Sequence, residues 1–104
     1  MGAIVDTLHL GQAELSMVKR RYPDCVITNI DKTTSHRIIQ RYRVIIPGES
    51  EESYYLFLLN NCMAMTSTNF LGRLESDQKF AQRMRAKVTE IIEKNRVAEA
   101  SSTR

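Results

Sequence analysis

The 104-residue sequence contains no tryptophan, two prolines, four glycines and two histidines. Because the four glycines are scattered, they do not form a glycine-rich phosphate-binding loop. No run of about 18 apolar residues occurs, as a transmembrane helix would need. The first residues also lack a basic segment followed by a continuous apolar stretch, which an export signal would have. We therefore expect a soluble cytoplasmic protein that makes no contact with a membrane.

Cysteine is equally scarce, since the chain has only Cys25 and Cys62, and neither belongs to a CxxC pair. Each lies in an apolar stretch, where small buried thiols are common, so we expect structural roles rather than a disulfide or a metal site. The histidines show no spacing to a nucleophile that implies catalysis. We predict no catalytic residue, no metal and no cofactor, and we do not expect an enzyme. The remaining enzymatic alternative uses Cys25 or His36 and requires a depressed thiol pKa.

The composition is that of a folded globular protein, with 42% hydrophobic and 26% charged residues. A chain of this length suits one compact core. We predict a single α+β domain over residues 1–96, followed by a flexible polar tail over residues 97–104. The net charge of +3 is too small an excess to imply a nucleic-acid partner by itself.

The apolar pattern predicts the element order α-β-β-β-α. Residues 6–22 are expected to form a helix that Pro23 ends, because apolar residues recur there at steps of three and four. Residues 25–31 and 36–46 are expected to form a hairpin, and residues 54–65 a third strand, giving a three-stranded antiparallel meander sheet. A long C-terminal helix is expected over residues 76–95, with Ser76 or Asp77 as its N-cap.

This element order resembles that of the double-stranded-RNA-binding domain. The basic residues Lys79, Arg83 and Lys87 are similar to the basic start of the last helix in that family, and His36 lies near a loop position where the family carries a histidine. The glycine- and lysine-rich turn before that helix is absent here. The resemblance therefore concerns element order alone, and it implies an RNA partner only by analogy.

Arginines alternate with apolar residues in the expected second strand, where Arg37, Arg41 and Arg43 share one face because side chains on a strand have a period of two. At about 3.3 Å per residue this row spans roughly 20 Å, enough to meet several phosphates. A solvated face whose arginines pair with acids such as Asp31 is the ordinary alternative. Nucleic-acid binding is thus kept as an alternative function, with the residues Arg37, Arg41, Arg43, Lys79, Arg83 and Lys87.

The expected third strand is apolar on both faces, and only two helices are expected to cover the two faces of the sheet, which leaves an open face or a dimer interface. This surplus of apolar surface, together with several methionines that can adapt to varied partners, indicates an interface. We therefore expect a small non-catalytic module that forms a homodimer or binds another protein through an uncovered sheet face or the C-terminal helix. The expected interface residues are Tyr55, Phe57, Met63, Met65 and Met84.

Overall fold

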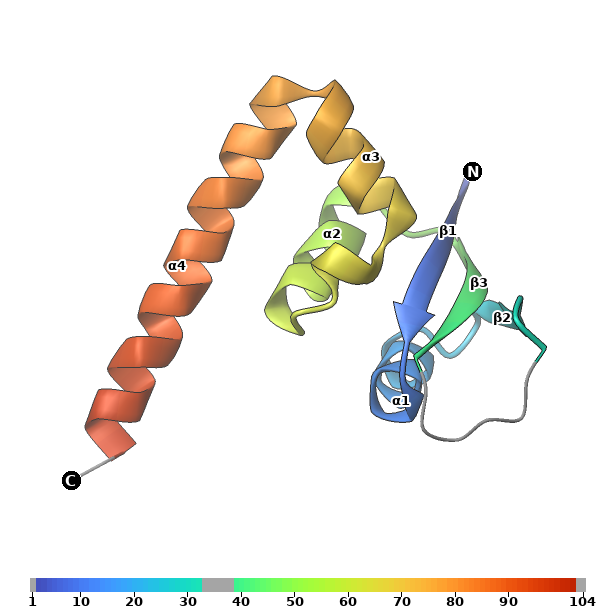
Figure 1. Cartoon of the computed structure of the whole chain (residues 1–104), viewed down its shortest axis with the longest axis horizontal. Helices are drawn as coiled ribbons and strands as arrows, with labels where there is room; N and C mark the ends of the chain where they lie inside the picture. Colours follow the sequence, from blue (N-terminus) through green and yellow to red (C-terminus); the bar gives the residue numbers. More distant parts are fainter. Residues whose placement is uncertain (1, 33–38, 103–104) are drawn as a thin grey trace. The chain divides into compact units, whose positions relative to one another are not determined.

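A computed structural model describes residues 2–32 and 39–102, and the side chains of residues 2–32 and 39–96. The protein is α+β, as predicted, but its elements do not follow the predicted α-β-β-β-α order (Figure 1). They form two compact units, Met1–Leu71 and Gly72–Arg104. In chain order the elements are β1 (Ala3–Leu10), α1 (Gln12–Arg21), β2 (Val26–Asn29), β3 (Gln40–Pro47), α2 (Glu51–Asn60), the 3-10 helix η1 (Ala64–Thr66), α3 (Thr68–Ser76) and α4 (Gln78–Ser102).

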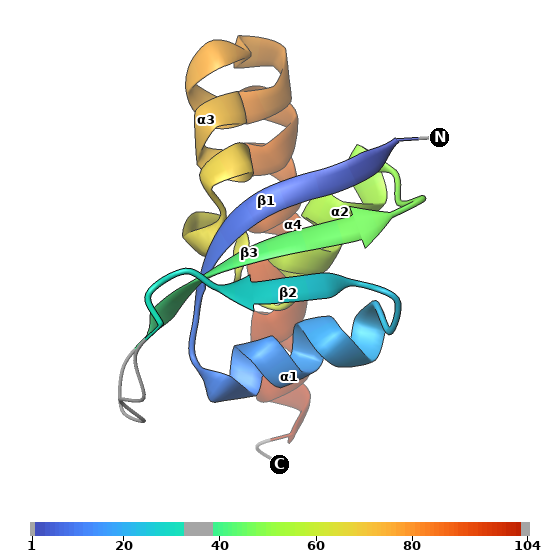
Figure 2. The ribbon, with the colours of Figure 1, turned by 90° about the vertical axis from the view of Figure 1, so that its right-hand side faces the viewer.

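The sheet belongs to the first unit and has the strand order β1-β3-β2, with both pairings antiparallel (Figure 2). The predicted hairpin is confirmed, since β2 pairs with β3. The predicted meander is wrong, because the third strand comes from the start of the chain and pairs with β3 along its whole length. The resemblance to the double-stranded-RNA-binding domain rested on the element order and loses its basis with it.

The predicted helix over residues 6–22 is β1 followed by α1. Both periods fit the early apolar residues, because Ile4 and Leu8 are four apart and also of one parity. In the structure every even position from Ile4 to Leu10 is buried, including Asp6. Because Asp6 is a charged residue at one of these buried positions, the sequence of β1 does not show a regular alternation of apolar and polar residues. Gly11, which the sequence analysis placed in the middle of the helix, is instead the N-cap of α1.

The core lies between the helices α1 and α2 and the face of the sheet that carries the even-numbered residues of β1 and β3. Leu8, Val44 and Leu58 are almost completely buried there. The ring of Tyr22, at the end of α1, lies edge-on to Phe57 of α2 with 5.3 Å between the ring centres. Such aromatic contacts add about 0.5–1.5 kcal/mol to the free energy gained from burial. Both helices therefore cover the same face of the sheet.

The expected third strand over residues 54–65 is also wrong, because this segment begins inside α2. A run of six apolar residues does not by its periodicity distinguish a buried strand from a buried helix. The helix begins after Gly48, whose positive φ of 70° turns the chain away from β3. Ser50 is the N-cap, and its side chain accepts a hydrogen bond from the Ser53 amide, while Glu51 and Glu52 occupy the favourable first turn.

The end of α2 is a Schellman turn with cysteine in the position that usually holds glycine. The Cys62 amide donates to the Leu59 carbonyl at 3.1 Å, and the Met63 amide donates to the Leu58 carbonyl at 2.7 Å. Cys62 has a positive φ of 58°, a conformation that costs a residue with a Cβ atom about 1–2 kcal/mol. Buried Met63 and Leu58 provide the apolar residues typical of this turn.

We expect Cys62→Gly to raise the free energy of unfolding by about 1 kcal/mol, because glycine adopts positive φ without steric strain. The exposed thiol makes no contribution to the core that glycine would remove. Urea unfolding of the two proteins measures the difference, and Cys62→Ala is the matched control, since it removes the thiol but keeps the Cβ atom. A glycine variant no more stable than the alanine variant would contradict the assignment.

A buried carboxylate joins β1 to the segment that starts α3. The Asp6 side chain, 2% exposed, accepts hydrogen bonds from the hydroxyl groups of Tyr54 and Ser67. It also accepts from the Thr68 hydroxyl at 3.1 Å and from the Asn69 amide at 3.0 Å. Burial and the charge of Asp6 together raise the pKa of Tyr54 far above its ordinary value. Four donors thus compensate one buried charge, as burial of a carboxylate requires.

The second unit consists of the end of α3 and the long helix α4. Asp77 is the N-cap of α4, as predicted, because its side chain accepts from the Phe80 amide at 3.1 Å. That hydrogen bond holds the pKa of Asp77 below its ordinary value. The helix continues to Ser102 rather than ending near Asn95. The single domain over residues 1–96 and the flexibility of residues 97–104 stay predictions.

Candidate functional site: the open face of the sheet

One face of the sheet carries the odd-numbered residues of β1 and β3 and the even-numbered residues of β2. Among residues 2–32 and 39–71 no helix of the first unit covers it, because α1 and α2 both pack on the other face. We call this surface the open face. The strand register arranges its side chains in three rows across the sheet. The rows are Val5, Ile45 and Val26; Thr7, Arg43 and Thr28; and His9, Arg41 and Ile30.

The first row is aliphatic on all three strands. Val5 is 44% exposed and Val26 is 57% exposed, while Ile45 between them is half-buried. Single exposed apolar side chains are common on protein surfaces, whereas a contiguous group of them marks an interaction site more often. The three side chains form one short apolar strip across the width of the sheet, which we call the aliphatic row.

The third row contains an arginine that already has a partner. The Arg41 Nη2 atom lies 2.7 Å from Asp31 Oδ1, and Arg41 Nε donates to the same oxygen at 2.9 Å. These hydrogen bonds hold the pKa of Asp31 below its ordinary value. Pairing with nearby acids such as Asp31 is the ordinary explanation of an arginine face, and this prediction is confirmed for Arg41. The charge of Arg41 is therefore largely balanced within the fold.

Arg43 occupies the middle of the open face without such a partner. It lies on the central strand between two threonines, and no ion pair joins it to any described residue. A hollow of about 420 Å³ adjoins it. The lining residues are Val5, Asp6, Thr7, Ile30, Arg43, Thr68 and Asn69.

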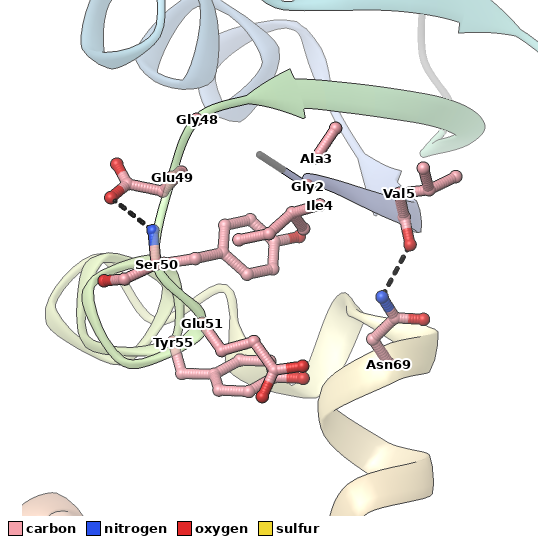
Figure 3. A pocket seen from close by; sticks show the side chains of 11 residues that line it. Gly2, Ala3, Ile4, Val5, Gly48, Glu49, Ser50, Glu51, Tyr55 and Asn69 are labelled. Carbon is pink, nitrogen blue, oxygen red and sulfur yellow. Dashed lines mark hydrogen bonds between the residues drawn. The ribbon is translucent and has the colours of Figure 1, made fainter.

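A second hollow, of about 640 Å³, lies at the end of the first unit where β1 begins and α2 starts (Figure 3). The Asn69 side-chain amide, which belongs to both hollows, donates to the Val5 carbonyl at 2.6 Å. Glu49 accepts from the Ser50 amide at 3.0 Å, and Glu51 lines the same hollow. Within the described residues no group of three acidic, histidine or cysteine side chains could hold a metal ion.

The nucleic-acid candidates are distributed over both units. Arg41 and Arg43 are exposed on one strand face, as predicted, with Tyr42 on the opposite face. Arg37 and His36 lie outside the described residues. The remaining candidates, Lys79, Arg83 and Lys87, are exposed on α4 in the second unit.

The predicted interface residues lie in helices or loops rather than on a strand. Tyr55 belongs to α2 and is buried, and Phe57 of the same helix is half-buried. Met63 and Met84 are buried, whereas Met65 is 70% exposed. Their proposed part in an interface stays a prediction. The residues of the aliphatic row were missed, because Val5 was assigned to a helix and the pairing of β1 with β3 is not local.

No aromatic ring belongs to the three rows of the open face. Tyr42 points to the covered face, and Tyr22, Tyr54 and Tyr55 are buried in the core. Binding of single-stranded nucleic acid commonly depends on bases stacked on exposed aromatic rings. The open face offers aliphatic groups and guanidinium groups instead.

The enzymatic alternative required a thiol with a depressed pKa. Cys25 is only half-buried, yet burial raises the pKa of its thiol, and the nearby charge of Lys19 does not reverse the shift. A raised pKa makes the nucleophilic thiolate scarcer at neutral pH. The direction of this shift is the opposite of the one that the enzymatic alternative requires.

No family model, curated protein or solved structure matches the chain. Over the described residues, no helix combines the length and apolarity that crossing a membrane requires.

Proposed function

We propose that this protein is a non-catalytic interaction module that binds a second protein through the open face of its sheet. The observation that supports this most directly is the aliphatic row, in which Val5, Ile45 and Val26 lie side by side on a face that the first unit leaves uncovered. An antiparallel sheet often has one solvated face, but such a face normally carries polar side chains at these positions.

The size of the aliphatic row limits the kind of complex. Complete burial of a valine or isoleucine side chain contributes about 1.5–3 kcal/mol, and these three side chains are already partly buried. Burial of the remaining exposed surface of these three side chains contributes about 2–4 kcal/mol to the binding free energy, whereas a dissociation constant of 1 μM needs about 8 kcal/mol. The partner must therefore also contact polar residues next to the row, and the complex is of the transient type.

Charge and chemistry favour a protein partner over nucleic acid. Of the two described arginines on the open face, Arg41 is paired with Asp31, which leaves Arg43 as the main source of positive charge. Non-specific binding of nucleic acid usually needs several phosphate contacts. The aliphatic row would gain nothing from a phosphate backbone, because its free energy comes from apolar burial.

The test uses peptides selected from a random displayed library for binding to the full chain. Val5→Thr combined with Val26→Thr removes the apolar groups but keeps the β-branched shape that suits a strand. We expect this double variant to bind the selected peptides about tenfold more weakly. Val88→Thr on α4, where Val88 is 39% exposed, is the matched control and should change affinity less than twofold.

Equal affinity of the wild type and the double variant for every selected peptide would overturn the proposal. Circular dichroism and urea unfolding of each variant establish that the sheet is intact. Binding of a random-sequence single-stranded DNA pool that depends on Arg43, without any selected peptide, would favour the nucleic-acid alternative.

Self-association through α4 is a second candidate, supported by the exposure of that helix. From Arg85 to Arg96 only Ile91 is half-buried, while Val88 and Ile92 are 39% and 60% exposed. A helix without tertiary packing is marginally stable in water, so a second copy packed against Val88, Ile91 and Ile92 would stabilise α4. Light-scattering mass between 1 and 100 μM tests this candidate. We expect a dimer that Ile92→Gln dissociates, and a strict monomer over this range would exclude it.

A further inference from the structure

The hollow beside Arg43 gives the open face a chemical preference. Its walls come from two directions, since Val5, Thr7 and Arg43 belong to the sheet, whereas Thr68 and Asn69 belong to the start of α3. The bridge between Leu8 and Ser67 and the Asn69 hydrogen bond to Val5 fix that segment along the edge of β1. The hollow is therefore formed within the first unit, by two segments that hydrogen bonds join.

The donors at the hollow are suited to an anion. The guanidinium group of Arg43 has five N–H donors in a planar fork that matches a carboxylate, and none of the described residues forms an ion pair with it. Thr7 lies directly across from Arg43 in the strand register and adds a hydroxyl group. Arg41, two residues away on the same face, already binds a carboxylate, since its Nε and Nη2 atoms both contact Asp31 Oδ1.

The one acidic residue in the lining does not oppose this assignment. Asp6 is paired with Val44 in the register and therefore points to the covered face, opposite to Arg43. Its carboxylate already accepts hydrogen bonds from four donors of the chain. An anion at Arg43 would approach from the other side of the sheet.

We propose that the partner is a protein segment in which an acidic side chain is flanked by aliphatic residues, with the carboxylate bound by Arg43 and the aliphatic residues on the aliphatic row. This inference rests on the proposed function and gives the partner its chemistry. The rows support it, because they are adjacent along the strands: Thr7, Arg43 and Thr28 each lie two residues from a member of the aliphatic row on the same strand and the same face. One extended segment can reach both rows.

A second copy of the chain is a poor occupant of the same surface. Arg43 lies on the central strand in the middle of the open face, so two open faces packed on a twofold axis would bring their arginines together. Like charges in contact disfavour such a complex. The acidic segment avoids this repulsion.

The experiment uses the peptides selected on the full chain and two substitutions of one residue. Arg43→Gln removes the charge, whereas Arg43→Lys keeps the charge and loses the planar fork. We expect Asp or Glu to be enriched in the selected peptides, and Arg43→Gln to weaken their binding at least tenfold, with Arg43→Lys intermediate. Arg85→Gln, on an exposed position of α4, is the matched control and should change affinity less than twofold.

A double-mutant cycle then assigns the contact. Replacing the acidic residue of the peptide by its amide should weaken binding to the wild type about tenfold and should have no further effect on Arg43→Gln. Peptides that need the aliphatic row but tolerate both changes within twofold would overturn this inference and leave the proposed function standing. Peptides that bind the Val5→Thr and Val26→Thr double variant as tightly as the wild type would overturn both this inference and the proposed function. Arg43-dependent binding of the DNA pool that acidic peptides do not displace would also overturn the inference.

Discussion

Replacing Asp6 by alanine is expected to lower the free energy of unfolding by at least about 3 kcal/mol. The substitution leaves the hydroxyl groups of Tyr54, Ser67 and Thr68 and the Asn69 amide without their acceptor. Each buried donor that loses its partner costs about 1–3 kcal/mol, and part of this cost is recovered where water reaches Thr68 and Asn69. Urea unfolding with a shared slope for all variants measures the loss.

Two further variants keep this prediction testable if the alanine variant does not fold. Asp6→Asn retains one acceptor oxygen, and Tyr54→Phe removes one donor, so each should cost about 1–2 kcal/mol. Asp24→Ala is the control, because Asp24 is exposed, and it should lie within about 0.5 kcal/mol of the wild type. An Asp6→Ala variant as stable as Asp24→Ala would show that the carboxylate does not join β1 to the start of α3.

Alkaline pH is expected to unfold the protein through two tyrosines. Burial, with a contribution from the negative charge of Glu49, raises the pKa of Tyr22 to about 12, and burial together with the charge of Asp6 raises the pKa of Tyr54 well above its ordinary value. A folded-state pKa above the unfolded value of about 10 means that the unfolded chain loses its proton first. The stabilisation is complete below pH 10 and is lost as pH rises through the folded pKa, at about 1.4 kcal/mol per pH unit for each tyrosine.

Unfolding free energies between pH 8 and pH 12 test this expectation, together with the absorbance of tyrosinate at 295 nm. Lysines titrate in the same range in every variant, so the difference between the wild type and a Tyr→Phe variant isolates one tyrosine. Tyr22→Phe and Tyr54→Phe should each remove about half of the excess slope. Four tyrosines that all titrate near pH 10 in the folded protein would contradict the burial of these hydroxyl groups.

Local patterns predicted the parts of the fold that local physics determines. Arginines alternate with apolar residues around Arg41 and Arg43, and this period of two predicted a strand with both arginines on one face. The exposure of both arginines in β3 confirms the prediction. The hairpin joins two strands that follow each other in sequence, and the N-cap at Asp77 depends on a residue three positions away; the structure confirms both.

The errors have non-local causes. Asp6 concealed β1, because its burial depends on donors that lie 48 to 63 residues further along the chain. The apolar run of α2 fitted a strand or a helix equally well, and the decisive signal was the sequence Pro47 to Glu52, which ends a strand and starts a helix. The aliphatic row needs the register of β1 on β3 and of β2 on β3 at once, so no single segment of the sequence shows it.

The most direct test of the open face as a binding site is the change in backbone amide chemical shifts when the tightest selected peptide is added to the isotope-labelled chain. We predict that the largest shifts map to Val5, Thr7, Thr28, Arg43 and Ile45, with smaller shifts at Asn69. The same peptide should leave the amides of Tyr54, Leu58 and Val18, on the covered side of the sheet, nearly unchanged. Shifts confined to α4, or spread over the core with none on the open face, would contradict the account.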